Sequence, residues 1–557
     1  MPPYCTTSWP WRMSPLTLAL ALIFAGGCKP GNIVRGDPHP TPDEGPPGTA
    51  EPSHPANSAG SEDAGVPWVM VPLEPTAENS SGITTDGTGS LILDGSGAAV
   101  VLSHIWVANS SEGTVSKINT VTGVEEGRYR TGPNQSSYAG PDPSRTTVGL
   151  DGDVVVANRM GSSAVRIHAD PATCPDKNGD GIITTSTGPT DVKPWGEDEC
   201  VLWYRPFEQN SLARAAAFDF ESGLDGELSS NVWIGLYSTH KVVKLDARTG
   251  EILAEVSIPG YWPYGMAFDG QGNLWVQGCT GLVRINTRTL EWDARPIRCG
   301  YGIAVDEAGN VWTNGAGCIG RYTPATDSWE VLANLTGNYG AIALNLGGIA
   351  VDGAGSVWAA DVMGGAFRVD AATVKLLGTV SVSGGCKGMA VDFHGKVWCI
   401  SLSAQKAYRI DPGDLSVASF PTGQFPYTYS DMTGFQLKNA APPAGFYRST
   451  LTGCGTNQEW LELSWTADTP PGTQVRFRAR TANTPAELGS KPFVLVATQP
   501  SDTPPIDLRA KLEGATPGSA TAALLQLEVV LSSTTRGVTP TLSNVRVAGT
   551  CPLPPID

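Results

Sequence analysis

Short stretches of alternating apolar and polar residues recur through the middle of the chain. Val-Arg-Ile at 283–285, Phe-Arg-Val at 367–369 and Tyr-Arg-Ile at 408–410 each place a basic residue between two apolar ones. A period of two predicts half-exposed strands. Gly-Asn and related pairs lie between many of these stretches and accept the positive φ of hairpin turns. The pattern therefore predicts many short antiparallel strands.

A longer pattern repeats about every 40 residues, which is the length of one propeller blade. A Gly-x-Ala-x-Asp strand, a turn and a Val-Trp or Leu-Trp pair recur in residues 265–275, 302–312, 348–358 and 388–398. Weaker copies place Trp106, Val155 and Trp233 at the same anchor position. Four-stranded units that repeat in this way cannot bury both faces alone. Seven anchors therefore predict a seven-bladed β-propeller.

These residues also carry a resemblance to known families. The sequence Trp-Thr-Asn-Gly-Ala-Gly-Cys-Ile-Gly-Arg-Tyr at 312–322 and the Gly-Ile-Ala-Val-Asp strands resemble streptogramin (virginiamycin B) lyase and NHL repeats. Residues 107–119 resemble the YVTN repeat of surface-layer propellers. The resemblance covers roughly residues 85–440 and implies a propeller. It implies no particular chemistry, because one fold hosts many functions.

The catalytic residues of the lyase family have no visible match here. The resemblance would imply a His and a Glu-x-His pair that act with magnesium in an elimination. The chain has six histidines, and none has Glu two residues before it; they are His39, His54, His104, His168, His240 and His394. No catalytic residue is therefore transferred to this chain.

The ends of the propeller suggest how its ring closes. Residues 430–437 look like a further strand after the seventh blade, and we predict that they pair within the first blade. Residues 91–94, Leu-Ile-Leu-Asp, are an alternative inner strand for that blade. The predicted propeller covers residues 83–440.

Beyond 441–443, Ala-Pro-Pro, the pattern predicts a second domain. Alternating strands without helical periodicity fill residues 444–557 and predict a small β-sandwich. Cys454 near its start and Cys551 near its end are expected to form a disulfide. This domain either binds glycans or has a structural role only.

The N-terminus carries targeting signals. An apolar run at 16–24, followed by Ala-Gly-Gly-Cys, predicts a signal peptide over 1–27 and, by resemblance to the bacterial lipobox, lipidation of Cys28. Residues 28–82 are rich in Pro, Gly and Ser and predict a disordered tether. The expected location is the bacterial cell envelope, lipid-anchored to the outer membrane, on its periplasmic or exposed side.

The net charge of the chain limits the classes of molecule that it is expected to bind. The chain has 557 residues with 66 Gly, 44 Pro and a formal net charge of −17. Such an acidic chain is an unsuitable partner for nucleic acid, whose phosphates require a basic face. The expected partners are the membrane, through the lipid anchor, and an envelope protein or glycan.

An insertion at 170–203 in the second blade holds the sharpest motif. Asp176, Asn178 and Asp180 supply oxygen ligands at alternate positions, a Gly follows, and Ile182 offers its carbonyl. This spacing predicts a structural calcium loop, although Thr187 replaces the usual bidentate Glu. The alternative is a plain turn held by a Cys174–Cys200 disulfide, which we predict in either case. Pairing among the other propeller cysteines stays open, namely Cys279, Cys299, Cys318, Cys386 and Cys399.

The repeat also predicts a ring of side chains at one mouth of the central channel. If the Gly-x-Ala-x-Asp strands are equivalent, the residue before each Gly lies there. The predicted ring consists of Thr146, Arg214, Tyr264, Tyr301, Gly347 and Lys387. Two cations and two phenols suit an acidic or sugar-like ligand, and a purely structural ring is the alternative.

Three functions therefore remain in competition. The expected one is non-catalytic recognition of a protein or glycan by a propeller scaffold. The second is a streptogramin lyase-like enzyme with a divergent, metal-assisted catalytic set. The third is a structural component of the envelope.

Overall fold

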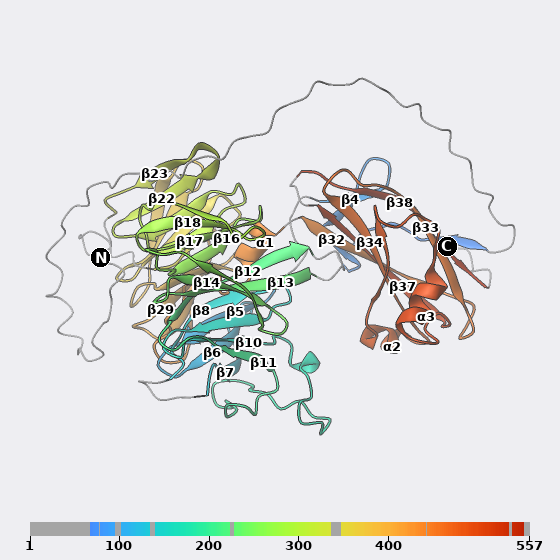
Figure 1. The fold of residues 1–557 in the computed structure, drawn as a ribbon, viewed down its shortest axis with the longest axis horizontal. Helices are drawn as coiled ribbons and strands as arrows, with labels where there is room; N and C mark the ends of the chain where they lie inside the picture. The colour runs from blue at the N-terminus through green and yellow to red at the C-terminus, as the bar shows by residue number, and fades with distance from the viewer. Residues whose placement is uncertain are drawn as a thin grey trace, which may run out of the picture. The chain divides into compact units, whose positions relative to one another are not determined.

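A computed structural model describes residues 67–550, except 77, 95–101, 134–139, 223–227, 336–346, 430, 442 and 534–536. The signal peptide, Cys28, residues 29–66 of the tether and Cys551 lie outside the described residues. The described chain is almost entirely β-structure, arranged as a propeller and a sandwich (Figure 1). No helix in this part of the chain is long and apolar enough to cross a membrane.

The propeller contains seven sheets within the described residues, which confirms the predicted number of blades. Within each blade, every strand pairs antiparallel with the strand before it in the sequence. The first blade contains β5 (His104–Asn109), β6 (Thr114–Asn119) and β7 (Glu125–Arg130). The second contains β8 (Pro143–Val148), β9 (Val154–Asn158), β10 (Ser163–Ile167) and β11 (Val201–Pro206). The third contains β12 (Ala213–Ser222), β13 (Leu228–Leu236), β14 (Lys241–Asp246) and β15 (Ile252–Ser257).

The remaining four blades repeat this order. The fourth contains β16 (Gly265–Phe268), β17 (Asn273–Gln277), β18 (Gly281–Asn286) and β19 (Trp292–Pro296). The fifth contains β20 (Gly302–Val305), β21 (Val311–Gly315), β22 (Cys318–Thr323) and β23 (Ser328–Leu332). The sixth contains β24 (Ile349–Val351), β25 (Ser356–Asp361), β26 (Gly365–Asp370) and β27 (Lys375–Ser381). The seventh contains β28 (Gly388–Val391), β29 (Val397–Ser401), β30 (Lys406–Ile410) and β31 (Val417–Pro421). Two short 3₁₀ turns cover Pro171–Thr173 and Pro324–Thr326.

The anchor position of every blade is fully buried, as the repeat predicted. Each large apolar side chain buried in this way stabilises the fold by about 1.5–3 kcal/mol. The motif Asp adds a role that the pattern did not reveal. Oδ2 of Asp306 accepts a hydrogen bond from Nε1 of Trp312 at 2.8 Å, while its Oδ1 accepts from the turn amides of Ala308 and Asn310. One carboxylate thus fixes both the hairpin turn and the indole, and the fourth, sixth and seventh blades repeat the arrangement.

The basic residue of the third strand links neighbouring blades. Arg368 lies over the ring of Trp358 and donates to the carbonyl of Pro412 in the next blade at 2.9 Å. Equivalent bonds join Arg321 to Ala371 and Arg409 to Thr120. The alternation in the sequence therefore marks contacts between blades as well as half-exposed strands.

The C-terminal end of the propeller closes the ring on the first blade. Asn109 of β5 bridges Pro426, the amide of Ser110 donates to Phe425, and the amide of Trp106 donates to Met432. Residues 425–432 therefore run along β5 as its inner neighbour. The chain after the seventh blade does pair with the first blade, as predicted. The predicted strand at 430–437 is wrong at its C-terminal end, because α1 (Phe435–Ala440) begins at residue 435.

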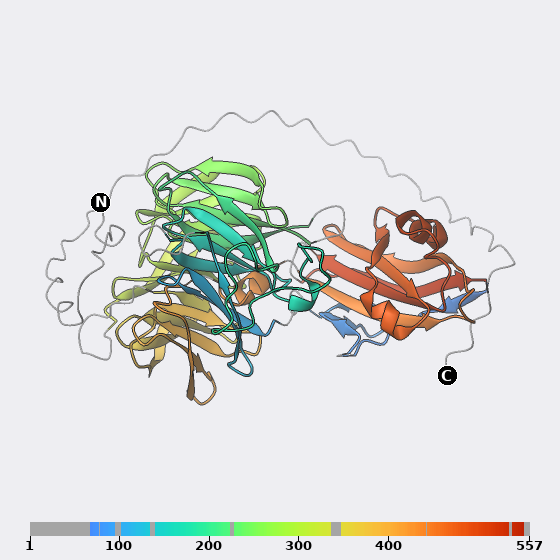
Figure 2. The same cartoon turned by 90° about the horizontal axis from the view of Figure 1, so that it is seen from below.

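Helix α1 packs against the ends of the inner strands of three blades. It contacts β16, β20 and β28, and its orange ribbon lies within the propeller in Figure 2. Asp431 accepts hydrogen bonds from the amides of Gly434 and Leu437 and so holds the first turn. A small cavity remains between α1 and the inner strands, with Asp431 and Gln436 among its lining residues.

The sandwich contains two packed sheets. One has the order β3 (Ile83–Thr85), β4 (Leu91–Leu93), β38 (Thr541–Gly549), β33 (Trp460–Asp468) and β36 (Ile506–Asp507), with β1 (Trp68–Met70) also paired to β38. The other has the order β2 (Ser80–Ser81), β32 (Ala444–Thr452), β37 (Leu524–Ser533), β34 (Thr473–Ala482) and β35 (Val494–Gln499). Two short helices, α2 (Pro485–Ser490) and α3 (Leu508–Ala515), follow β34 and β36.

The sandwich takes strands from both ends of the described chain, which corrects the predicted domain boundaries. Trp68 pairs with Ala548, and Leu91 pairs with Leu542, so residues 91–94 are not the inner strand of the first blade. Val71 and Leu91 are buried in the sandwich core. The blue N-terminal strands accordingly lie among orange and red ones in Figure 1. The predicted start of the propeller at 83 and end of the tether at 82 are therefore wrong, because apolar side chains in this segment complete the sandwich.

Candidate functional site

Five residues from five blades and two from the segment that closes the ring meet where the inner strands of the propeller begin. We call this group the channel cluster, and it consists of Arg145, Arg214, Tyr264, Tyr301, Lys387, Tyr427 and Tyr429. The inner strands approach closely here, which explains the motif glycine: a Cβ on Gly302 would lie 2.4 Å from the carbonyl oxygen of Gly347, and one on Gly388 would lie 2.3 Å from that of Thr428. Any larger residue would force the strands apart.

Three phenol groups form the centre of the channel cluster. Tyr264 donates to the hydroxyl of Tyr301 at 2.9 Å, and the Tyr427 hydroxyl lies 3.1 Å from that of Tyr264 and 3.0 Å from that of Tyr301. Tyr264 and Tyr301 are buried, whereas Tyr427 is partly exposed. Tyr427 is therefore the member of the hydroxyl triangle with exposed surface.

Three cations surround the phenol triangle. Lys387 donates to the Tyr301 hydroxyl at 2.5 Å, and Arg214 donates to that of Tyr264 at 3.3 Å. The guanidinium carbon of Arg145 lies 3.2 Å from the centroid of the Tyr429 ring, and Arg145 has no exposed surface. Buried cations of this kind normally require a counter-charge.

The charges of the cluster shift one another's pKa values. Burial and the charges of Arg145 and Arg214 lower the pKa of Lys387 to about 8, although Tyr427 opposes this effect. Burial, which acts to raise the pKa of Tyr427, is outweighed by Lys387, Arg214, Arg145 and Arg159, so that the pKa falls well below its ordinary value. Burial raises the pKa of Tyr264 to about 12. Tyr427 is therefore the phenol that ionises first.

Several buried polar atoms beside the cluster lack hydrogen-bond partners. They include Nε of Arg145, Nε of Arg214 and the hydroxyl of Tyr429. Asp142 interacts electrostatically with Arg214, and its Oδ2 lies 2.5 Å from Nη2 of Arg159. An anionic guest with hydrogen-bond acceptors would satisfy the free donors of both arginines.

The structure brings together four of the five predicted channel residues with polar side chains. Arg214, Tyr264, Tyr301 and Lys387 all lie in the cluster. Thr146 does not, because its hydroxyl lies 3.3 Å from the carbonyl of Trp106. The prediction placed the second blade in the wrong register: Thr147 pairs with the anchor Val155, and a bulge between Pro143 and Arg145 shifts the strand.

Sequence reasoning missed Arg145, Tyr427 and Tyr429. The bulge hid Arg145, and residues 425–432 lack the Gly-x-Ala-x-Asp motif. A usable signal was nevertheless present, since Trp-Pro-Tyr at 262–264 and Phe-Pro-Tyr at 425–427 are alike. Both tyrosines enter the phenol triangle from equivalent positions after a Pro.

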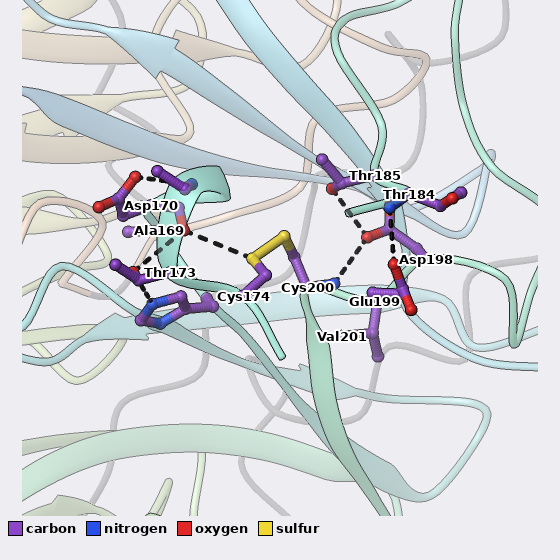
Figure 3. Close-up of a disulfide and its surroundings, with 12 residues drawn as sticks. Ala169, Asp170, Thr173, Cys174, Thr184, Thr185, Asp198, Glu199, Cys200 and Val201 are labelled. Atoms are coloured by element: carbon purple, nitrogen blue, oxygen red, sulfur yellow. Dashed lines mark hydrogen bonds between the residues drawn. A yellow bond between two sulfur atoms is a disulfide. The ribbon is translucent and has the colours of Figure 1, made fainter. Parts of the chain in front are cut away.

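The insertion forms the predicted Cys174–Cys200 disulfide (Figure 3). Near it, Asp198 accepts from the hydroxyl of Thr185 at 2.9 Å and Glu199 from the amide of Thr184 at 2.6 Å. Two further disulfides join Cys299 to Cys318 and Cys386 to Cys399. Cys279 and Cys454 are also disulfide-bonded, while the predicted partner of Cys454, Cys551, lies outside the described residues.

The predicted calcium loop is exposed and held by its own backbone. Asp176 accepts from the amides of Gly179 and Gly181, Asn178 from Asp180 and Asp180 from Ile182. Glu199 accepts from the amides at 177 and 178, so it binds the loop from outside. Across the described ranges, no group of three or more His, Cys, Asp or Glu side chains is placed to hold a metal ion.

The four described histidines have partners away from the cluster. His104 pairs with Glu126, His168 with Asp153, His240 with the carbonyl of Tyr261, and His394 lies near Ser103. No described histidine is thus among the channel cluster residues. This agrees with the absence of the lyase motif in the sequence.

Comparison with solved structures returns propellers of this type. Virginiamycin B lyase from Staphylococcus aureus is 16% identical, covers 50% of this chain and 84% of its own, and has a TM-score of 0.37. A streptogramin B lyase structure is 16% identical and covers 60% and 94% with a TM-score of 0.39, and RRP9 WD40 repeats are 8% identical and cover 60% and 90% with a TM-score of 0.40. The chain is thus similar to streptogramin lyase-like propellers, and at these values the comparison adds nothing on activity.

A structure of a protein of unknown function from Bacteroides caccae is also similar. It is 11% identical and covers 51% of this chain and 97% of its own, with a TM-score of 0.35. No family model and no curated protein matches the sequence.

Proposed function

We propose that the protein is an envelope lipoprotein whose propeller binds an acidic, carboxylate-bearing sugar at the channel cluster. The single observation that supports this most is the meeting of Arg145, Arg214 and Lys387 around the hydroxyl triangle, with a free Nε on both arginines. Guanidinium and ammonium groups select carboxylates, while phenol hydroxyls suit sugar hydroxyls. Recognition requires no chemical step at this site.

Calorimetric titration of the full-length protein with glucuronate tests this proposal, with glucose as the neutral probe of matched shape. Arg214→Gln is expected to weaken glucuronate binding roughly tenfold or more, because it removes a charge-assisted hydrogen bond from a buried site. Arg248→Gln changes the charge equally on an exposed turn and serves as control. Equal affinity for glucuronate and glucose, or an unaltered Arg214→Gln variant, would contradict the proposal.

The anchor and the calcium loop extend this proposal. Processing at Cys28 would place the protein on the outer membrane, and metabolic labelling with a fatty acid, lost in Cys28→Ala, tests it.

Calcium would stabilise the loop at Asp176, Asn178, Asp180 and the carbonyl of Ile182. Calorimetry with calcium on the wild type and on Asp176→Ala separates a metal site from a plain turn.

A second candidate function is an elimination reaction with Tyr427 as base. The observation that favours it is the lowered pKa of Tyr427 among four cations. A Tyr427 phenolate would remove the proton next to a sugar carboxylate, and the C–O bond at the neighbouring carbon would break to leave a double bond. The Tyr427 phenol formed in this way would then give the same proton to the departing oxygen. Unsaturated product from a uronate-containing oligosaccharide, absent with Tyr427→Phe, would establish catalysis. Binding of the same oligosaccharide without product would establish recognition only.

A further inference from the structure

The outward face of the five-stranded sheet in the sandwich gathers arginines from neighbouring strands. Strand β37 lies between β32 and β34, and its Glu528 is directly opposite Arg448 on one side and Arg478 on the other. Arg480 follows two residues along β34 and lies opposite Gln526. Because side chains alternate along a strand, these residues share the face that points away from the core.

A single carboxylate lies beneath two guanidinium groups. Glu528 is 2.7 Å from Nε of Arg448 and also binds Nη2 of Arg478. The Glu528 side chain is 1% exposed, whereas those of Arg448 and Arg478 are 41% and 35% exposed. The carboxylate therefore positions the arginines, and their outer edges remain open to solvent.

Phe493 extends this cationic surface. The guanidinium carbon of Arg480 lies 4.4 Å from the centroid of the Phe493 ring, and those of Arg448 and Arg478 lie 5.5 and 5.7 Å from it. Burial and the charge of Arg448 lower the pKa of Arg480. Positive charge is thus concentrated here on a chain whose net charge is −17.

We propose that this arginine face, formed by Arg448, Arg478 and Arg480 around Phe493, binds an acidic polysaccharide. Alternate residues of one strand are about 7 Å apart, and strands two places apart are separated by about 10 Å. Guanidinium groups spread in this way suit carboxylate or sulfate groups repeated along a polymer, each held by a planar fork of donors.

The opposite charge of the rest of the chain favours a single polymer chain over a larger anionic surface. The net charge of −17 on the whole chain disfavours approach to a large anionic surface such as a membrane or a nucleic acid duplex. A polysaccharide chain can contact the arginine face alone. The proposal is independent of the channel cluster, since it involves none of the same residues.

Binding of the full-length protein to heparin and to polygalacturonate, with neutral dextran as control, tests the inference. Arg480, whose Nε and Nη1 donate to Gln526 and to the carbonyl of Lys491, contributes a positive charge to this face. Arg480→Gln is therefore expected to weaken binding of the acidic polymers roughly three- to tenfold, because that charge is lost while Glu528 keeps both partners. Arg288→Gln makes the same charge change on an exposed propeller turn and is expected to have no effect. A triple variant, Arg448→Gln with Arg478→Gln and Glu528→Gln, removes the ion pairs together and is expected to abolish binding.

Three results would overturn the inference. One is no difference between the acidic polymers and dextran, and another is equal weakening by Arg288→Gln and Arg480→Gln. The third is binding that occurs only with phosphatidylglycerol vesicles or DNA and not with polysaccharide. Arg214→Gln is expected to leave polymer binding unchanged, so failure here and failure of sugar binding in the channel are distinguishable.

Discussion

The channel cluster and the arginine face both group cations, around phenol hydroxyls in one and around a carboxylate in the other, and in opposite surroundings. In the propeller, Lys387 and the two arginines are buried around phenol hydroxyls. In the sandwich, Arg448 and Arg478 extend from a buried carboxylate into water. Burial shifts the pKa values of the groups in the channel cluster, so the charge there depends on pH. The charges of the arginine face are exposed, so salt screens their interactions. The two sites should therefore respond differently to mutation, pH and salt.

The largest expected loss of stability comes from removal of the central acidic group. Tyr427→Phe removes the ionisable hydroxyl that the buried cations surround and is expected to lower the free energy of unfolding by about 3 kcal/mol, because buried donors and charges lose a polar partner. Glu528→Gln is expected to lower it by only about 1–2 kcal/mol, because its arginines can turn to water. Denaturant unfolding of both variants measures this, and equal losses would remove the distinction.

The pH dependence of the free energy of unfolding should also differ between the two sites. The folded protein releases the Lys387 proton at about pH 8, whereas an unfolded lysine keeps its proton to about pH 10.5. The unfolded chain therefore binds more protons between these values, so stability rises with pH across them, by about 3 kcal/mol. Lys387→Met should abolish this rise in thermal unfolding, and Arg480→Gln should leave it unchanged. A rise that persists in Lys387→Met would assign it to another group.

The same titration predicts the pH dependence of sugar binding. Glucuronate affinity should fall as pH rises through about 8, since Lys387 loses its charge there. Polysaccharide binding by the arginine face should be flat over that range, because arginine stays protonated. Calorimetry at a series of pH values distinguishes the two, and a flat glucuronate profile would argue against a role for Lys387.

Salt should give the smallest effect. The coupling between Arg448 and Glu528, obtained from a double-mutant cycle, is expected to fall by a few tenths of a kcal/mol towards about 1 M salt, where screening acts within about 3 Å. The coupling between Lys387 and Tyr427 should change less, because water and ions reach it poorly. The reverse order would contradict the assigned burial of the two sites.

The sequence was sufficient to predict the propeller because its signal is repeated. Glycine, aspartate and tryptophan recur at fixed positions, since each blade needs close inner strands, a held turn and an indole for packing. From this repeat, Arg214, Tyr264, Tyr301 and Lys387 were placed correctly. Arg145 was not, because a bulge in β8 breaks the register that the repeat assumes.

The N-terminal strands could not be predicted in the same way. Strand β1 has three residues, Trp-Val-Met, and its partner Ala548 lies at the other end of the chain. No local pattern indicates such a distant pairing. The arginine face was likewise hidden, because its residues come from three strands whose order is set only by the folded sheet.

The position of the propeller between β4 and β32 has a consequence for synthesis on the ribosome. The first four strands of the sandwich precede every blade, yet β1, β2 and β4 pair with β38 or β32, which follow the whole propeller. The ring can close through residues 425–432 and bring its two ends together. Ring closure of the propeller thus favours pairing of the C-terminal sandwich strands with the N-terminal ones.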